Sequence, residues 1–328
     1  MAQSRLTTAL DTGALTLPAG PILVMRPPAG MDLSALPRAD VTISHTFRPD
    51  YEYWEAAGYD VVVGAKPATV ALVVLPRAKA LARAMIAEAA SLADLVVVDG
   101  QREDGIDSIW RDIRSRLPEL DLSGVVKAHG RLFWFAAADV FADWVLPEPK
   151  AFDGFVTTAG VFSDGAVDRG SALLAAALPA KLPSRIADLG AGWGYLAAAA
   201  LAREGVISID LVEAEALALE CAKLNIPDDR ARFTWADATR FKADKVFDAV
   251  IMNPPFHVGA KGDPALGRAF IAAAARMLHP GGQLWMVANR HLPYEEALRE
   301  QFRVVEELPG GDGAFKLFHA AKPARKAR

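Results

Sequence analysis

The segment Asp188-Leu189-Gly190-Ala191-Gly192-Trp193-Gly194 decides the fold of the second half of this chain. It begins at the end of Arg185–Leu189, which is predicted to be a strand, and it precedes residues 195–203, which are predicted to form a helix. A glycine-rich turn between a strand and a helix allows a ligand to approach the backbone closely. The turn is not the dinucleotide fingerprint, because Tyr195 stands where that motif requires a further glycine.

The rest of the second half alternates predicted strands with predicted helices, which is typical of a parallel α/β sheet. Strands are predicted at residues 206–212, 231–236, 247–252 and 283–288, and helices at 214–224 and 266–278. Residues 302–307 and 314–320 flank a glycine-rich turn, so they predict a terminal antiparallel hairpin.

The first half shows the same alternation and predicts a second α/β domain. Strands are predicted at 61–63, 71–75, 94–98 and 131–135, and helices at 78–91 and 107–117. Residues 97–101 give the counterpart of the glycine turn, with one glycine in place of three, and no Asn-Pro-Pro segment occurs in this half. Two prolines with mixed charge at 147–150 predict an exposed linker, so the domains are placed at 1–150 and 151–328.

The composition excludes several classes of protein. The 328 residues are 52% hydrophobic and 23% charged, which excludes a disordered or low-complexity chain. No apolar run reaches the length of a membrane span and no signal-peptide core is visible, so we expect a cytoplasmic protein without a membrane partner. The single cysteine and the absence of a histidine–carboxylate spacing predict no metal site. The net charge of −4 indicates no strong basic field for nucleic acid.

Two acidic residues complete a ligand site with the glycine turn. Glu213 ends the second predicted strand, where a carboxylate can accept from both hydroxyls of a ribose. Asp237 follows the third, where it can accept from an adenine amino group. Ligands of open α/β sheets lie at the carboxyl ends of strands, so the set predicts an adenosine ligand without a pyrophosphate, namely S-adenosylmethionine. Ordinary turn glycines and solvated acids would explain any one of these residues but not the ordered set.

Asn253-Pro254-Pro255-Phe256 follows the fourth predicted strand directly. The prolines stiffen this turn and cannot donate hydrogen bonds, so the Asn253 amide oxygen and the Pro254 carbonyl are predicted to be acceptors. An exocyclic amine is a poor nucleophile because its lone pair is delocalised into the ring. Two acceptors on its hydrogens would localise that pair toward a methyl donor, and Phe256 could stack on the target ring. A purely structural proline turn is the alternative interpretation.

On these residues, the second half resembles a class I S-adenosylmethionine-dependent methyltransferase. Within that class it resembles the ribosomal RNA small subunit methyltransferase C family and its large-subunit relative, which are guanine-N2 methyltransferases. The resemblance extends over residues 155–320, through the flanking segments 155–163, 168–174, 287–294 and 315–317. It implies two tandem Rossmann-like domains. The N-terminal one is a degenerate copy that binds no cofactor and supports RNA binding or folding. The catalytic C-terminal one has a mostly parallel seven-stranded sheet that ends in an antiparallel hairpin.

The resemblance also implies the role of each site residue. The methionine part of S-adenosyl-L-methionine would be lined by Asp188, Gly190, Gly192 and Gly194. The ribose would be held by Glu213, and the adenine by Asp237 and Ala238. The target amine would be bound by Asn253, Pro254, Pro255 and Phe256, and the cofactor would be covered by Phe162, Ser163 and Gly170. The implied partner is ribosomal RNA or the small ribosomal subunit, with the enzyme acting as a monomer. The slightly acidic charge departs from the basic surface expected of such an enzyme.

Three functions fit the sequence. The first is S-adenosylmethionine-dependent methylation of a guanine N2 amine in ribosomal RNA, with 16S rRNA of the small subunit favoured over the large-subunit RNA. The second keeps the chemistry but acts on adenine N6 or protein glutamine, because similar Asn-Pro-Pro turns serve those substrates. The third is a non-catalytic RNA-binding assembly factor. The intact turn at 253–256 argues against it, because a scaffold has no need of that turn.

Overall fold

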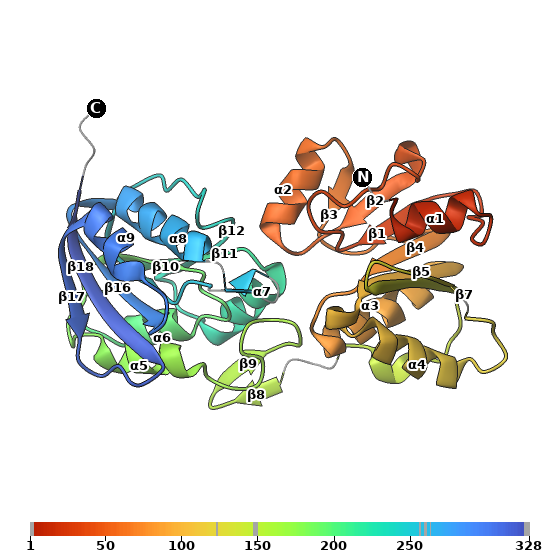
Figure 1. Cartoon of the computed structure of the whole chain (residues 1–328). Helices are drawn as coiled ribbons and strands as arrows, with labels where there is room; N and C mark the ends of the chain where they lie inside the picture. The colour runs from red at the N-terminus through yellow and green to blue at the C-terminus, as the bar shows by residue number, and fades with distance from the viewer. Residues whose placement is uncertain are drawn as a thin grey trace. The chain divides into compact units, whose positions relative to one another are not determined.

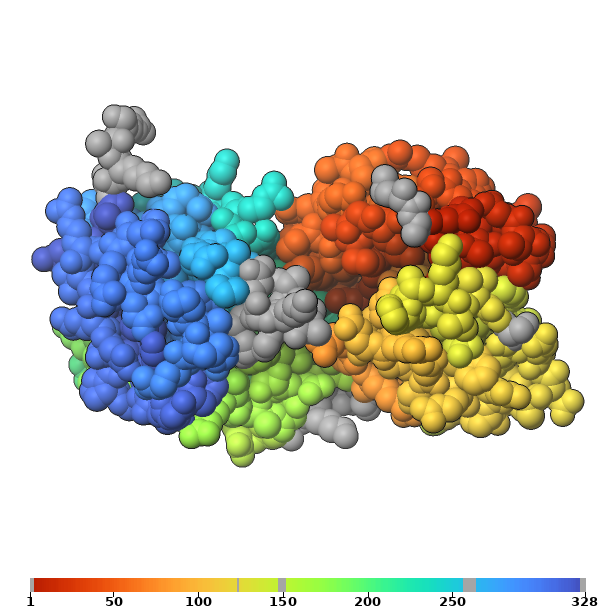
Figure 2. Space-filling model, in the orientation of Figure 1, coloured from red at the N-terminus to blue at the C-terminus, as the bar shows by residue number. Residues whose placement is uncertain are grey.

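The chain is analysed as a computed structural model, which describes residues 3–122, 124–146, 150–255, 257–258, 261–262 and 264–324. It divides into two compact units, Met1–Glu148 and Pro149–Arg328. In Figures 1 and 2 the first unit has the red to yellow colours and the second the green to blue ones. The predicted linker prolines at 147 and 149, and Phe256, lie outside the described residues.

The second unit contains one seven-stranded sheet with the order β12-β11-β10-β13-β16-β18-β17. The strands are β10 (Arg185–Leu189), β11 (Ser208–Glu213), β12 (Ala231–Trp235), β13 (Phe247–Met252), β16 (Leu278–Asn289), β17 (Phe302–Leu308) and β18 (Phe315–Pro323). All pairs from β12 to β16 are parallel, whereas β18 runs antiparallel to both of its neighbours. The prediction of a mostly parallel sheet that ends in an antiparallel hairpin is confirmed. Short two-stranded sheets, β8 (Lys150–Phe152) with β9 (Phe155–Thr157) and β14 (His257–Val258) with β15 (Lys261–Gly262), accompany it.

Helices cover both faces of this sheet (Figure 1). They are α5 (Arg169–Ala177), α6 (Tyr195–Leu201), α7 (Ala216–Asn225), α8 (Pro264–Met277) and α9 (Tyr294–Gln301). Alternate residues of β13 point to opposite faces: Val250 and Met252 pack with α8 and α9, whereas Ala249 and Ile251 pack with α5 and α6. Burial on both faces explains why the central strands read as continuous apolar runs.

The first unit repeats this architecture with the order β3-β2-β1-β4-β5-β7-β6. Its strands are β1 (Ile22–Met25), β2 (Val41–Ser44), β3 (Asp60–Val62), β4 (Val70–Val74), β5 (Leu95–Gln101), β6 (Gly124–Lys127) and β7 (Gly130–Ala136). Its helices are α1 (Arg5–Asp11), α2 (Arg48–Ala56), α3 (Lys79–Leu92) and α4 (Ile106–Arg116). Numbered along the chain, both sheets have strand order 3-2-1-4-5-7-6, so the tandem Rossmann-like fold is confirmed. Among the described residues, no helix is both long enough and apolar enough to cross the lipid bilayer.

The predicted counterpart of the glycine turn in the first unit is wrong. Residues 97–101 lie inside β5, which pairs with β4 and β7 and occupies the fifth position of the sheet. The strand equivalent to β10 is β1, and the segment that follows it is Arg26-Pro27-Pro28-Ala29-Gly30. β1 and β2 have only four residues each, too few for a period to be recognised in the sequence.

Candidate active site

The glycine turn lies at the carboxyl end of β10, the central strand of the second sheet, and leads into α6. Gly190, Gly192 and Gly194 have φ angles of +71°, +55° and +94°, which side chains rarely tolerate. A Cβ on Gly194 would also stand 2.7 Å from Cδ1 of Ile226. A Cβ on Gly192 would meet no atom within 4 Å, so this glycine leaves open space beside the backbone.

Glu213, the last residue of β11, is hydrogen-bonded to the turn. Its Oε2 accepts from the Gly192 backbone N–H at 2.8 Å, and its Oε1 accepts from that of Glu215 at 2.7 Å. Burial raises the pKa of Glu213, and these backbone N–H groups oppose the rise. Each carboxylate oxygen can accept more than one hydrogen bond, so Glu213 can support the turn and still receive ribose hydroxyls.

Asp188 is the most unusual polar group of the site. Its side chain is fully buried, and within the described part of the chain neither carboxylate oxygen has a hydrogen-bond partner. Burial, followed by the charge of Glu213, raises the pKa of Asp188 to about 8. A buried carboxyl without a partner is costly, so a ligand that brings a positive charge or donors near it would relieve that cost.

Asp237 follows β12 and forms a local turn. Its Oδ1 accepts from the backbone N–H of Thr239 at 2.8 Å and from the Thr239 hydroxyl at 2.6 Å. No described residue donates to its Oδ2, which remains available as an acceptor. The next residue, Ala238, is buried in the core that includes Phe247.

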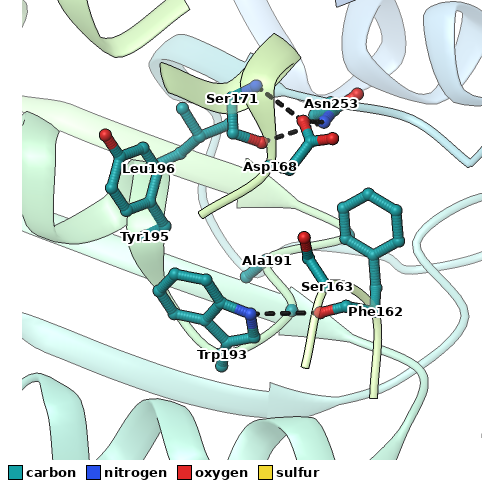
Figure 3. A pocket seen from close by; sticks show the side chains of 11 residues that line it. Phe162, Ser163, Asp168, Ser171, Ala191, Trp193, Tyr195, Leu196 and Asn253 are labelled. Atoms are coloured by element: carbon teal, nitrogen blue, oxygen red, sulfur yellow. Dashed lines mark hydrogen bonds between the residues drawn. The ribbon is translucent and has the colours of Figure 1, made fainter. Parts of the chain in front are cut away.

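A cavity of about 40 Å³ lies between the glycine turn, the segment before α5 and the end of β13 (Figure 3). It is lined by Phe162, Ser163, Asp168, Ser171, Gly190, Ala191, Gly192, Trp193, Tyr195, Leu196 and Asn253. Of the predicted site residues, it brings together Phe162, Ser163, Gly190, Gly192 and Asn253. The others do not line it: Asp188, Gly194, Glu213, Asp237, Ala238, Gly170, Pro254 and Pro255. Its volume suits the reacting end of a ligand, and a whole nucleoside would extend along the carboxyl ends of the strands.

Trp193 is a site residue that sequence reasoning missed. Its indole N–H donates to the backbone carbonyl of Phe162 at 3.1 Å (Figure 3), and its ring packs against those of Phe155 and Tyr195. This contact ties the loop at Phe162 and Ser163 to the glycine turn. Phe162 nevertheless remains 56% exposed as a residue and lines the cavity. A bulky aromatic residue inside a turn of small residues was the signal available in the sequence.

Asn253 follows β13 and reaches the same cavity. Its Nδ2 donates to Oδ2 of Asp168 and to Oγ of Ser171, both at 2.9 Å (Figure 3). The amide oxygen has no partner among the described residues, so it remains an open acceptor. Pro254 is buried and Pro255 is exposed. Asp168 and Ser171 were not predicted as site residues, because their approach to Asn253 joins positions more than 80 residues apart.

The strand order, the glycine turn after β10 and the Asn253-Pro254-Pro255 segment after β13 define a class I methyltransferase. A family model described as the methyltransferase small domain matches residues 154–319. The chain belongs to the ribosomal RNA small subunit methyltransferase C family. A member from Shewanella sp. (strain MR-4) is 30% identical over 75% of each chain, and one from Shewanella amazonensis is 31% identical over 73% of each.

The fold agrees with a solved structure of similar extent. This is the T. thermophilus 16S rRNA N2 methyltransferase in complex with AdoMet and guanosine, with a TM-score of 0.78. The match covers 94% of this chain and 90% of the other, at 24% identity. The likeness therefore includes both tandem units.

The raised pKa of Asp188 predicts a pH-dependent stability. Because the folded state binds this proton more tightly than the unfolded chain, where the pKa of Asp is ~3.9, the stabilisation is complete below that pH. It is lost as the pH rises toward about 8. Asp188→Asn has no titrating group at this position. The melting temperature of the variant minus that of the wild type should therefore increase by a few degrees between pH 5 and pH 8.

Differential scanning calorimetry at several pH values measures this gain. The exposed Asp229→Asn is the matched control and should follow the wild type. A constant difference between Asp188→Asn and the wild type across the pH range would contradict the prediction.

Proposed function

We propose that this chain transfers a methyl group from S-adenosylmethionine to the N2 amine of a guanine in 16S rRNA of the small ribosomal subunit. Membership of the small subunit methyltransferase C family supports the substrate, and the relative solved with AdoMet and guanosine supports the cofactor and the base. The observation that carries the proposal is that Asn253 and the glycine turn line one cavity. An rRNA substrate implies a cytoplasmic site of action.

The cofactor site is proposed from the residues at the carboxyl ends of β10, β11 and β12. Gly190, Gly192 and Gly194 let the backbone approach the methionine part, and the buried carboxyl of Asp188 favours its positive charge. Glu213 accepts from the ribose hydroxyls. The adenine amine is received by the open Oδ2 of Asp237, beside Ala238. When bound, the cofactor supplies an electrophilic methyl group on a sulfonium.

The target site is proposed around Asn253. The amide oxygen of Asn253 and the carbonyl of Pro254 accept the two hydrogens of the guanine N2 amine. They hold the amine in line with the methyl group and localise its lone pair, so positioning and electrostatics supply the acceleration. After transfer, the positively charged amine loses a proton to solvent. Pro255 keeps the turn rigid, and Phe256, outside the described residues, would stack on the base.

The first unit is proposed to bind no cofactor and to serve RNA binding or folding. Strand pairing places Val24 at the position of Asp188. Met25, the last residue of β1, pairs with Ser44, so the next residue, His45, stands at the position of Glu213. His45 is 2% exposed, and burial followed by the charge of Arg26 lowers its pKa to about 3. Arg26 occupies the place of Gly190, so other residues stand at the positions of Asp188, Glu213 and the first glycine.

The loop after β1 is also closed onto α2. Trp54 donates its indole N–H to the Pro27 carbonyl at 2.8 Å, and Oδ1 of Asp50 accepts from the Ala29 backbone N–H at 2.9 Å. Its backbone groups are therefore used within the unit, whereas the glycine turn of the second unit leaves space beside Gly192.

All residues assigned to catalysis come from the second unit of one chain, which supports a monomer as the functional form.

The wild-type chain should transfer tritium from labelled S-adenosylmethionine to small ribosomal subunits isolated from cells that lack the modification. Digestion of the RNA should yield labelled N2-methylguanosine as the methylated nucleoside, because the site is built for a planar amine beside a sulfonium. Labelled N6-methyladenosine, or label in protein, would support the second function, and no transfer would support the non-catalytic one.

Asn253→Ala should lower kcat by roughly 10²-fold or more, the size of effect seen when one preorganised polar group is removed from an active site. The dissociation constant for S-adenosylmethionine should stay within a few fold, because the amide contacts the target amine. Calorimetric titration and single-turnover transfer measure the two quantities. Transfer at the wild-type rate would show that the role assigned to Asn253 is wrong.

Glu213→Gln should weaken S-adenosylmethionine binding by roughly ten-fold or more, because hydrogen bonds to a charged acceptor contribute about 1.5–3 kcal/mol each. The amide also places a donor against the backbone N–H of Gly192 or Glu215, which disturbs the turn. Calorimetry with the exposed Glu220→Gln as control tests this expectation. Equal affinities in the two variants would remove Glu213 from the cofactor site.

A further inference from the structure

We propose that Asp168 and Ser171 are positioning residues for methyl transfer, which fix the Asn253 amide so that its oxygen, and not its nitrogen, faces the target amine. The inference rests on the proposed function, because it concerns the same amine-binding group. The observation that supports the inference is the pair of hydrogen bonds from Nδ2 of Asn253 to the carboxylate of Asp168 and the hydroxyl of Ser171.

An asparagine amide has nearly the same shape in its two flipped orientations, but only one of them can work here. With the oxygen toward the substrate, Asn253 accepts a hydrogen of the amine. With the nitrogen toward the substrate, it would present two hydrogens to a group that itself donates two, and the amine would be repelled. The reaction therefore requires a device that distinguishes the two ends of the amide.

The Asp168 carboxylate provides that distinction, because an ionised carboxylate accepts and cannot donate. Its Oδ2 lies 2.9 Å from Nδ2 of Asn253. A flip would set the amide oxygen against the carboxylate at this distance. The Ser171 hydroxyl can donate as well as accept, so it holds the amide in place, and the carboxylate selects its orientation. Since the bond to Asp168 is charge-assisted, it also polarises the amide and makes the amide oxygen a stronger acceptor.

Asp168 and Ser171 are themselves held at the start of α5. The same Oδ2 of Asp168 accepts from the backbone N–H of Ser171 at 2.7 Å and caps the helix. Ser171 is 8% exposed, so its hydroxyl is fixed close to Asn253. Arg169, between them, is directed away and pairs with Asp312 at 2.6 Å. The Asp168 carboxylate therefore caps α5 and also accepts from Asn253.

Gly170 completes this arrangement and does not line the cavity. A Cβ at this position would stand 2.9 Å from Cε1 of Phe315 and 3.1 Å from Oδ2 of Asp168. A side chain would therefore push the carboxylate away from Asn253 or separate α5 from β18. Gly170 therefore helps to place Asp168, and its contact with the cofactor stays a prediction.

The test replaces Asn253 by aspartate, which exchanges the donor for a second carboxylate. At pH 8, Asn253→Asp should transfer methyl at least 100-fold more slowly than the wild type, because two carboxylates about 3 Å apart repel. A pair this close shares a proton at mildly acidic pH. The protonated carboxyl introduced by the substitution then donates its O–H to Asp168, and its carbonyl oxygen again faces the amine. Activity relative to wild type should rise at least ten-fold between pH 8 and pH 5.5.

The second variant decides whether Asp168 is the partner. In Asn253→Asp/Asp168→Asn the pair no longer shares a proton, so the acid-dependent rise should disappear and activity at pH 8 should increase over Asn253→Asp. The exposed Asp164→Asn, in the same loop, is the matched control, and Asn253→Asp/Asp164→Asn should keep the rise. The other titratable groups at the pair are Arg169, paired with Asp312, and Tyr195, which lines the cavity.

Ser171→Ala separates positioning from helix capping, because it keeps the backbone N–H that Asp168 caps. It should lower kcat by about three- to ten-fold without changing KM for the ribosomal subunit, and loss of one buried hydrogen bond should lower the melting temperature by no more than a few degrees.

All variants are measured in the full chain, with labelled S-adenosylmethionine and small ribosomal subunits lacking the modification. If the wild type shows no transfer, the proposed function fails. If the wild type transfers but Asn253→Asp has a flat relative pH profile, or Asp168→Asn leaves its rise unchanged, the positioning role of Asp168 is wrong.

Discussion

The hydrogen bond from the backbone N–H of Gly192 to Glu213 joins the two strand ends on which the site depends. Asp188 pairs with Leu211 and Leu189 with Val212, so parallel pairing of β10 with β11 places Glu213 one residue beyond the paired segment and next to the turn. A shift of one residue in this register would turn the Glu213 side chain to the other face of the sheet. The cofactor site is therefore specified by the burial of the central strands on both faces.

The two units have different residues at equivalent positions of the same strand register. They have the same strand order, and pairing aligns Val24 with Asp188 and His45 with Glu213. The sheet core tolerates the exchange, because Val24 is a better buried residue than an unpartnered acid. Val24 thus spares the first unit the cost of a buried acid, and the second unit retains that cost at Asp188. A stable fold and a functional site are separate properties of one architecture.

Much of the second unit could be predicted from sequence because its central strands are long apolar runs between strong turn signals. The predicted bounds 185–189 and 247–252 are those observed. α5 and α9 were not predicted: α5 is apolar around much of its surface, and α9 has only eight residues. In the first unit, β1, β2 and β6 were missed: each has four residues, and none stands out as the valine run at 61–63 does for β3. The strand order makes β1, and not β5, the equivalent of β10. This order depends on tertiary pairing, for which the sequence contains no local signal.

The site residues divide in the same way. The glycine turn and the segment at 253–255 could be predicted as site residues because their chemistry depends on neighbours in sequence. Asp168 and Trp193 were not assigned, because their roles come from contacts with Asn253 and with the Phe162 carbonyl. An aspartate before a helix is recognised in sequence as an N-cap, which is a local feature. Nothing in its sequence context predicts that its carboxylate also accepts from the amide of Asn253.

The hydrogen-bonding groups left open at this site have a common character. Within the described residues, Asp237 offers Oδ2, whereas the donors of Asn253 are already used by Asp168 and Ser171. The Asn253 amide oxygen and the Pro254 carbonyl remain as further acceptors. A site with these open acceptors favours groups that donate hydrogen bonds. It suits a ligand that carries a positive charge next to a partner that presents an NH2 group. The satisfied donors of Asn253 therefore contribute as much to specificity as the open oxygens, because a misdirected amide would convert the acceptor nearest the substrate into a donor.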